Sequence, residues 1–245
     1  MTPELSTLRV QDGFRLRGES ISRLETFVDA AFAFAVTMMV ISVGTLPGSV
    51  PELLQALHRV PTFALCFLIL MLFWSGHNRW SRRYGLDSSS VTLWSLVLVL
   101  VVLIWLYPLR MVIGGGMYFV TGGWVPSDMQ ATSVGELQDC FVIYGVGFAV
   151  LSAVMIQLQR LALAGADELQ LDPLERNETR RELGSYVILL AFALASIALT
   201  FVVRLQSSPL VASLPGFLYS GIGPAMHFHH ARFHRLRRQL APRAG

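Results

Sequence analysis

Apolar residues run along this chain in long blocks separated by short polar or glycine-rich stretches. The blocks predict six helices, at about residues 23–46, 52–78, 90–113, 137–163, 184–205 and 209–230. Each block is close to the ~20 residues that a helix needs to cross a ~30 Å hydrocarbon core. The pattern therefore predicts an all-α integral membrane protein with six transmembrane helices, whose first partner is the lipid bilayer.

The composition agrees with this pattern. Hydrophobic residues make up 53% of the chain and charged residues only 14%, whereas soluble domains have roughly 25% charged residues. An ordinary soluble domain is thereby excluded. Cys66 and Cys140 each lie in an apolar block, so we expect buried thiols and neither a disulfide framework nor a zinc site.

The arginines are distributed unevenly about the predicted helices. Only Arg59, Arg110 and Arg204 fall on one side, and the other arginines precede helix one or follow helices two, four and six. By the positive-inside rule, both termini should be cytoplasmic. We expect a multi-pass protein of a cell membrane, in a bacterium the inner membrane.

Three segments follow from this topology. Residues 1–22 form a cytoplasmic N-terminal segment, residues 23–230 the transmembrane domain, and residues 231–245 a basic cytoplasmic tail. The tail is typical of an anchor on anionic lipid or of a nucleic-acid contact, and its place beside a membrane helix favours lipid. No nucleic acid is expected as a partner.

The first helix carries a row of bulky side chains. Phe34, Met38 and Ile41 recur at i, i+4 and i+7 on one face, Phe27 extends that face toward the start of the helix, and Thr37 lies beside it. Periodicity alone leaves open whether the face meets lipid, a neighbouring helix or an ion path.

Charged residues stand at the start of the same helix. Asp29 lies about one turn inside it, and an ionisable residue near the membrane indicates a functional site unless it only marks the helix start. If helices one and two are antiparallel neighbours, the candidate partners of Asp29 are Arg23, His77 and Asn78.

These residues carry a resemblance to a known family. The stretch Arg23-x-x-x-Phe27-Val28-Asp29 is similar to the Arg-x-x-x-Phe-Ser-Asp signature of the transmembrane protein 175 family of potassium channels. The stretches Trp74-x-x-His77-Asn78 and Tyr107-Pro108 resemble its second and third helices. The resemblance rests on the first three helices, because the last three agree mainly in number.

The resemblance implies a homotetrameric channel that passes monovalent cations, potassium preferred, with helix one of each protomer around a central path. The implied pore and gate residues are Phe34, Thr37, Met38 and Ile41. The implied signature and polar network residues are Arg23, Phe27, Asp29, His77 and Asn78.

Two departures from the family pattern stand out. Val28 replaces the signature serine, which removes a hydroxyl from the network, and a polar group left unpaired costs about 1–3 kcal/mol. Phe34 replaces a smaller aliphatic side chain, so four phenyl rings could close the pore more tightly.

A narrow apolar ring can gate a pore by excluding water, so these bulky side chains suit a hydrophobic gate. The sequence has no Thr-Val-Gly-Tyr-Gly type of carbonyl filter and no acidic ring inside a predicted span. We therefore expect no P-loop-type selectivity filter, and potassium preference comes only from the resemblance. No cofactor is expected beyond potassium as the permeant ion.

The densest chemical cluster lies at the end of helix six, with His227, His229, His230 and His234. The i, i+4 pair His230 and His234 could share a metal, the cluster could sense pH, or it could be a solvated helix end. No Asp, Glu or Cys lies nearby, so we expect no metal.

Two other functions were weighed against a channel. A metal-dependent membrane enzyme would need ionisable groups converging inside the bilayer, and helices four to six offer almost none between their ends, so we expect no enzyme. A non-conducting or proton-leak assembly protein on the same fold is the other alternative.

Overall fold

The computed structural model describes residues 8–18, 20–41, 47–127, 129, 133–204 and 208–240, with the backbone alone for residues 209 and 234–240. The fold is helical apart from one small hairpin. Its long helices are α1 (Arg23–Ile41), α3 (Val60–Tyr84), α4 (Ser89–Val120), α5 (Val134–Ala164), α6 (Pro173–Val203) and α9 (Ile222–Leu240). Its short elements are β1 (Val10–Gln11), β2 (Phe14–Arg15), α2 (Val50–Leu57), α7 (Pro209–Ala212), α8 (Leu214–Leu218) and the 3-10 helix η1 (Tyr219–Gly221).

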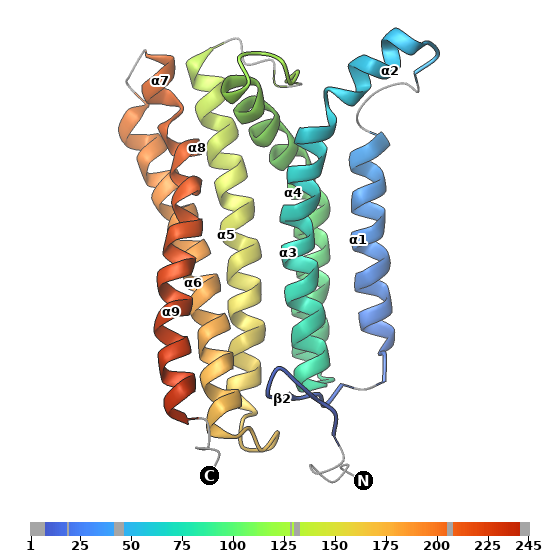
Figure 1. The fold of residues 1–245 in the computed structure, drawn as a ribbon, viewed down its shortest axis with the longest axis vertical. Coiled ribbons are helices and arrows are strands. Elements are labelled where there is room, and N and C mark those ends of the chain that lie inside the picture. Colours follow the sequence, from blue (N-terminus) through green and yellow to red (C-terminus); the bar gives the residue numbers. More distant parts are fainter. Residues whose placement is uncertain are drawn as a thin grey trace.

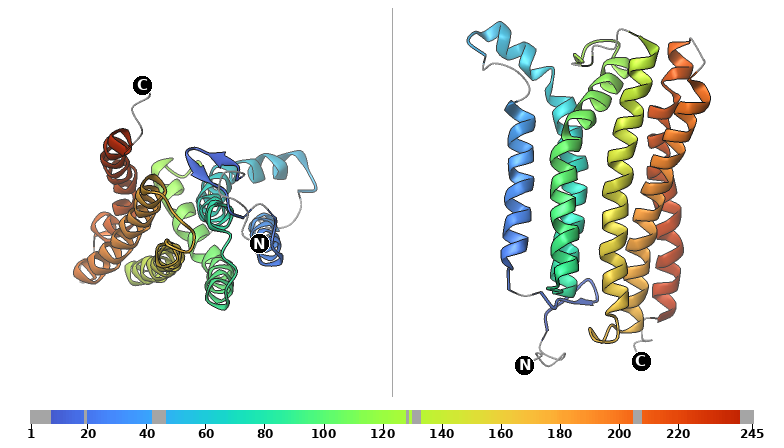
Figure 2. Two further views of the ribbon diagram at one scale, coloured as in Figure 1. Left: turned by 90° about the horizontal axis from the view of Figure 1, so that it is seen from below. Right: turned by 180° about the vertical axis from the view of Figure 1, so that it is seen from behind.

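The long helices stand side by side in one bundle (Figure 1). Helix α1 occupies one edge, where it packs against α3 and α4, and α9 occupies the other edge against α6 (Figure 2). The start of α1 and the end of α9 lie at the same end of the bundle (Figure 1). We call this the arginine-rich end, because Arg15, Arg17, Arg82, Arg83 and Arg176 lie there.

Within the described residues, five helices are long and apolar enough to cross a membrane, namely α1, α3, α4, α5 and α6. The predicted helical membrane architecture is thus confirmed, with five candidate spans where six were expected. The segment expected to be the sixth helix, 209–230, is divided into α7, α8, η1 and the start of α9. Pro215 and Gly216 lie in α8, and such residues weaken helix continuity.

Several helix boundaries differ from the sequence pattern. Helix α6 begins at Pro173 and not near residue 184, because Asp172 and Glu175 form a reciprocal capping box at its start. Helix α4 runs through Gly114 to Gly116 up to Val120, since a helix in an apolar setting satisfies its own backbone hydrogen bonds. Helix α9 continues to Leu240, past the boundary expected at residue 230.

An aromatic cluster fills the centre of the bundle. The Trp105 ring on α4 lies 5.3 Å from Tyr144 and 5.7 Å from Phe148 on α5, and 6.1 Å from Phe73 on α3. The Trp105 indole N–H donates to the Tyr144 carbonyl at 2.9 Å. This cluster joins α3, α4 and α5 into a packed unit against which α1 lies.

Candidate functional site

Helix α1 has one buried face and one open face. Val28, Phe32 and Met39 pack into the core with exposed fractions of 0%, 1% and 1%. On the opposite side, Phe34 is 56% exposed and Ile41 is 63% exposed. The buried face fixes how α1 sits on α3 and α4, and thereby which side chains point away from the bundle.

The open face contains most of the predicted pore residues. Phe27 is 53% exposed, and Thr37 is also exposed near the middle of the face. The Thr37 hydroxyl donates to the Ala33 carbonyl one turn earlier at 3.0 Å. Met38 lies at the margin, because it is half-buried and packs against the core. The open face is thus apolar apart from the hydroxyls of Thr26 and Thr37 and one charge, Arg23, at its start.

Asp29 lies at the edge of the buried face and is tied to α3. The Trp74 indole N–H donates to its carboxylate Oδ1 at 2.8 Å. Within the described part of the chain, Asp29 makes no bond to Arg23 or His77. Arg23 lies six positions earlier, which on an α-helix points it roughly 120° away from Asp29, and its side chain is exposed.

His77 takes part in a second, separate contact. It is 3% exposed, and its Nε2 lies 3.0 Å from the Ser95 hydroxyl on α4. This pair joins α3 to α4 where a histidine-to-aspartate contact was implied. Ser95 is fully buried and belongs to no recognised motif. Only its position on the inner face of α4 could have identified it as the partner of His77.

Glu25 is the second polar anchor of α1. It is 4% exposed, and its Oε1 lies 3.4 Å from the Arg82 Nε. The Asn78 side-chain amide donates to the same oxygen at 3.4 Å. Asn78 therefore contacts α1 through Glu25, where a contact with Asp29 was expected. The buried carboxylate makes Glu25 a site residue that the sequence identified only as a charge at the helix start.

A polar cavity of about 160 Å³ lies beside these contacts at the arginine-rich end. Its walls come from the segment before α1, the last turns of α3 and the first turns of α4. Glu25, His77, Ser95, Arg17 and Asp87 are among its lining residues. Charged and hydroxyl groups thus surround the start of α1, while Thr37 is the polar residue in the middle of its open face.

Two histidines of α9, His229 and His230, contact α6. His229 Nε2 lies 2.9 Å from the Arg181 carbonyl, and His230 Nε2 lies 3.1 Å from the Ser185 hydroxyl. The His234 side chain lies outside the described residues. No group of three or more His, Cys, Asp or Glu side chains placed to hold a metal is found among the residues that the structure describes. Cys66 and Cys140 are both buried free thiols.

Comparison with known proteins shows what this chain is similar to. The sequence model described as "Endosomal/lysosomal potassium channel TMEM175" matches residues 23–108, which include α1, α3 and Pro108 of α4. A "Potassium channel" from Marivirga tractuosa is 28% identical over 222 residues, covering 87% of each chain. A crystal structure of a variant of the potassium channel MtTMEM175, in complex with a Nanobody-MBP fusion protein, superposes with a TM-score of 0.78 at 25% identity. This chain is thus similar to TMEM175 potassium channels in sequence over residues 23–108 and in fold over most of its length.

The TMEM175 structure covers 92% of this chain and is itself covered over 99% of its length. The similarity in fold therefore includes α5, α6 and the segments after them. The resemblance found in the sequence was limited to the first three predicted helices. The family and the relatives found are potassium channels and not enzymes, so the membrane-enzyme alternative is set aside. The TMEM175 match begins at Arg23, the first residue of α1.

Proposed function

We propose that this chain is a member of the TMEM175 family and a potassium-preferring cation channel, in which four copies place α1 around a central pore. Phe34 and Ile41, with Met38 at their margin, would form a hydrophobic gate, and Thr37 would be the polar contact in the pore wall. The membrane is a cell membrane, in a bacterium the inner membrane, and the arginine-rich end faces the cytoplasm by the positive-inside rule.

The observation that carries the proposal is the open face of α1. Helix α1 stands at the edge of the bundle (Figure 1). Its Phe27, Phe34 and Ile41 side chains are 53%, 56% and 63% exposed. An apolar stripe of this length favours burial against lipid or against other copies of the chain. The signature at the start of the same helix and the channel relatives favour other copies.

The chemistry of the face suits a gate that works by excluding water. A ring of phenylalanine, isoleucine and methionine side chains holds no group that replaces the hydration shell of an ion. Such a ring blocks ions until it widens. Potassium preference rests on the channel relatives, since the open face offers only the hydroxyls of Thr26 and Thr37 as polar uncharged groups.

The experiment is potassium-driven flux in proteoliposomes that contain the purified protein, with sodium in parallel. Phe34→Ala shortens the proposed seal and should raise the basal flux several-fold. Phe201→Ala is the matched control, because Phe201 on α6 is also 56% exposed. Its removal should leave the flux at the wild-type level.

The outcomes separate the proposal from its alternative. Flux in the wild type that rises in Phe34→Ala, with potassium ahead of sodium, supports a channel gated on α1. Flux in Phe34→Ala alone indicates a pore that Phe34 holds shut. If an intact tetramer passes neither ion in either form, the non-conducting alternative is correct, and flux of protons alone supports the proton-leak alternative.

A further inference from the structure

The segment before α1 folds back onto the end of the bundle. Strands β1 and β2 form a hairpin around Asp12 and Gly13, both with positive φ. The Phe14 side chain is 1% exposed, with its ring centroid 5.5 Å from that of Tyr84. The Arg83 guanidinium lies 4.7 Å from the same centroid. Phe14 is thus fixed in a slot at the end of α3.

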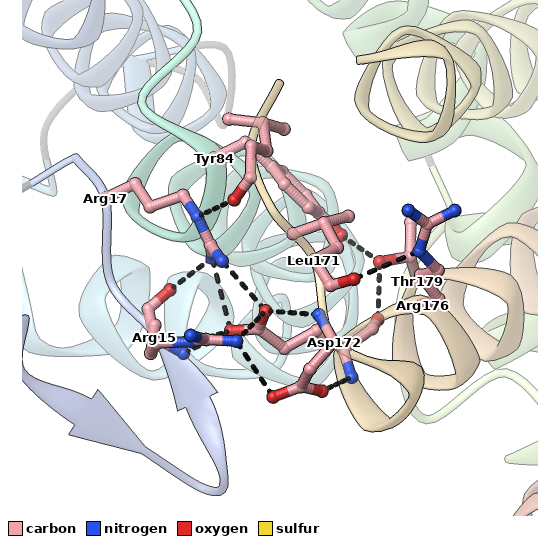
Figure 3. A network of polar contacts seen from close by, with 9 residues as sticks. Arg15, Arg17, Tyr84, Leu171, Asp172, Arg176 and Thr179 are labelled. Carbon is pink, nitrogen blue, oxygen red and sulfur yellow. Dashed lines mark hydrogen bonds and ion pairs between the residues drawn. The ribbon is translucent and has the colours of Figure 1, made fainter. Parts of the chain in front are cut away.

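Two arginines of this segment converge on one buried carboxylate (Figure 3). Glu175 on α6 is fully buried, and it accepts from the Arg15 backbone N–H at 2.8 Å and from Arg17 Nη2 at 2.8 Å. Arg15 Nη2 also donates to Asp172 at 3.0 Å. The hydrogen bond with Glu175 raises the pKa of the Arg15 guanidinium, although partial burial acts against this.

The same segment is bonded to the backbone of α3. The Gly18 N–H donates to the Arg82 carbonyl at 3.0 Å, and the Arg17 N–H donates to the Arg83 carbonyl at 3.4 Å. The approach at Gly18 is close, because a Cβ there would lie 2.5 Å from the Ser81 carbonyl oxygen. Residues 14–18, which we call the strap, therefore bind α3 and α6 at once.

The strap leads directly into α1. The Ser22 hydroxyl accepts from the Glu25 N–H at 3.0 Å at the start of the helix. Glu25 in turn contacts Arg82, whose carbonyl accepts from the strap. The first turn of α1 and the strap thus share the last turn of α3 as their anchor.

We propose that the strap is a positioning element for the gate, with Glu175 as its anchor residue. Resting on the proposed function, the inference is that Glu175 holds the start of α1 at a fixed place on the bundle. A seal made by side chains of four helices closes only if each helix is held in register with the others. Release of the strap frees the start of α1 and opens the seal to leak.

Two variants release the strap by different means. Glu175→Gln removes the charge that Arg15 and Arg17 share, while a glutamine at this position still closes the capping box with Asp172. Gly18→Ala changes no charge and pushes the strap off the Ser81 carbonyl. The atoms nearest to the added Cβ belong to Ser81, Arg82 and Gly85, so Gly18→Ala acts on the strap without changing Glu175. It therefore tests the inference if Glu175→Gln fails to fold.

Two readouts are taken on the full-length protein. Hydrogen–deuterium exchange of a peptide containing Arg15 reports the strap, because that backbone N–H is bonded to Glu175. Potassium flux in proteoliposomes reports the gate. The control is Asp167→Asn, which removes an ion pair between the 95% exposed Asp167 and Arg176 near the start of α6, without touching the strap.

We expect both strap variants to exchange faster and to raise basal potassium flux several-fold, with the control at wild-type values in both readouts. Faster exchange with unchanged flux, in a preparation where Phe34→Ala raises flux, overturns the inference and leaves the channel proposal standing. Unchanged exchange in both variants overturns it as well. If Phe34→Ala leaves potassium flux unchanged, the gate proposal is wrong. The inference about the strap is then wrong as well, because it rests on that gate.

Discussion

Trp74 on α3 holds the signature aspartate of α1, because its indole N–H donates to the Asp29 carboxylate at 2.8 Å. The contact lies one turn beyond Glu25, which binds Asn78 and Arg82 of the same helix. Helix α1 is thus joined to α3 by two polar contacts at its first turns and by apolar packing along the rest of its buried face.

The Trp74–Asp29 bond predicts an order of effects for two substitutions. Trp74→Phe removes the donor, leaves the carboxylate unpaired and should lower the free energy of unfolding in detergent by about 1–3 kcal/mol. Asp29→Asn keeps an acceptor oxygen for the indole and should cost less. The double variant measures the coupling. The bond would not contribute to stability if the two substitutions had equal and additive effects on the free energy of unfolding.

A second prediction concerns the buried ion pair between α3 and α6. Arg83 Nη1 lies 2.8 Å from Glu182 Oε1, and both side chains are 9% exposed. Glu182→Gln leaves the Arg83 charge uncompensated and should cost about 3–5 kcal/mol in free energy of unfolding. The exposed pair Arg204–Asp139 is the control, because Arg204→Gln should cost at most ~1 kcal/mol. Thermal unfolding of the two variants in one detergent checks the difference, and equal costs would contradict it.

A third prediction compares two helical glycines. A Cβ at Gly147 would lie 2.2 Å from Trp105 Cδ1, and Trp105 is 1% exposed at the centre of the aromatic cluster. Gly147→Ala should therefore destabilise the fold by about 1–3 kcal/mol through overpacking. A Cβ at Gly116 meets nothing within 4 Å, so Gly116→Ala should be neutral or stabilise α4 by about 0.5–1 kcal/mol. The melting temperature of Gly147→Ala should fall below that of the wild type, and that of Gly116→Ala should stay equal or rise. A Gly147→Ala variant with the wild-type melting temperature would contradict the close packing at Trp105.

A fourth prediction concerns the far end of the proposed seal. Ile41 is 63% exposed on the open face of α1, and Ile143 on α5 is 60% exposed. Ile41→Ala should raise basal potassium flux because it widens the apolar constriction, whereas Ile143→Ala should not. Both are measured in the proteoliposome assay at matched protein content. If Ile41→Ala and Phe34→Ala both leave flux unchanged, the gate does not lie on this face.

Hydropathy was sufficient to locate the helices that cross the apolar layer. The blocks around α1, α4 and α5 needed no tertiary information, because lipid and protein interior both require apolar side chains and satisfied backbone groups. The sequence pattern placed the start of α6 too late, because the charged residues after Pro173 indicated a loop. In the structure, Asp172 and Glu175 cap a helix there. The interruption of the last predicted helix at Pro215 was also missed.

The signature residues were found, but their partners were not all predicted. Asp29 bonds Trp74, and His77 bonds Ser95, because the packing of α1 on α3 and α4 decides which side chains meet. A serine or a tryptophan inside an apolar helix carries no signal of its partner. The strap was missed for the same reason. Phe14, Arg15 and Arg17 belong to residues 1–22, which the sequence indicated only as a cytoplasmic N-terminal segment.

The sequence by itself determined that the chain is helical and membrane-bound, and it located the signature of the family on α1, because these properties follow from residue types at short spacing. Only the tertiary structure decided which face of α1 is open and how Glu175 holds the segment before it. Both depend on contacts between residues far apart along the chain, which helical periodicity cannot encode.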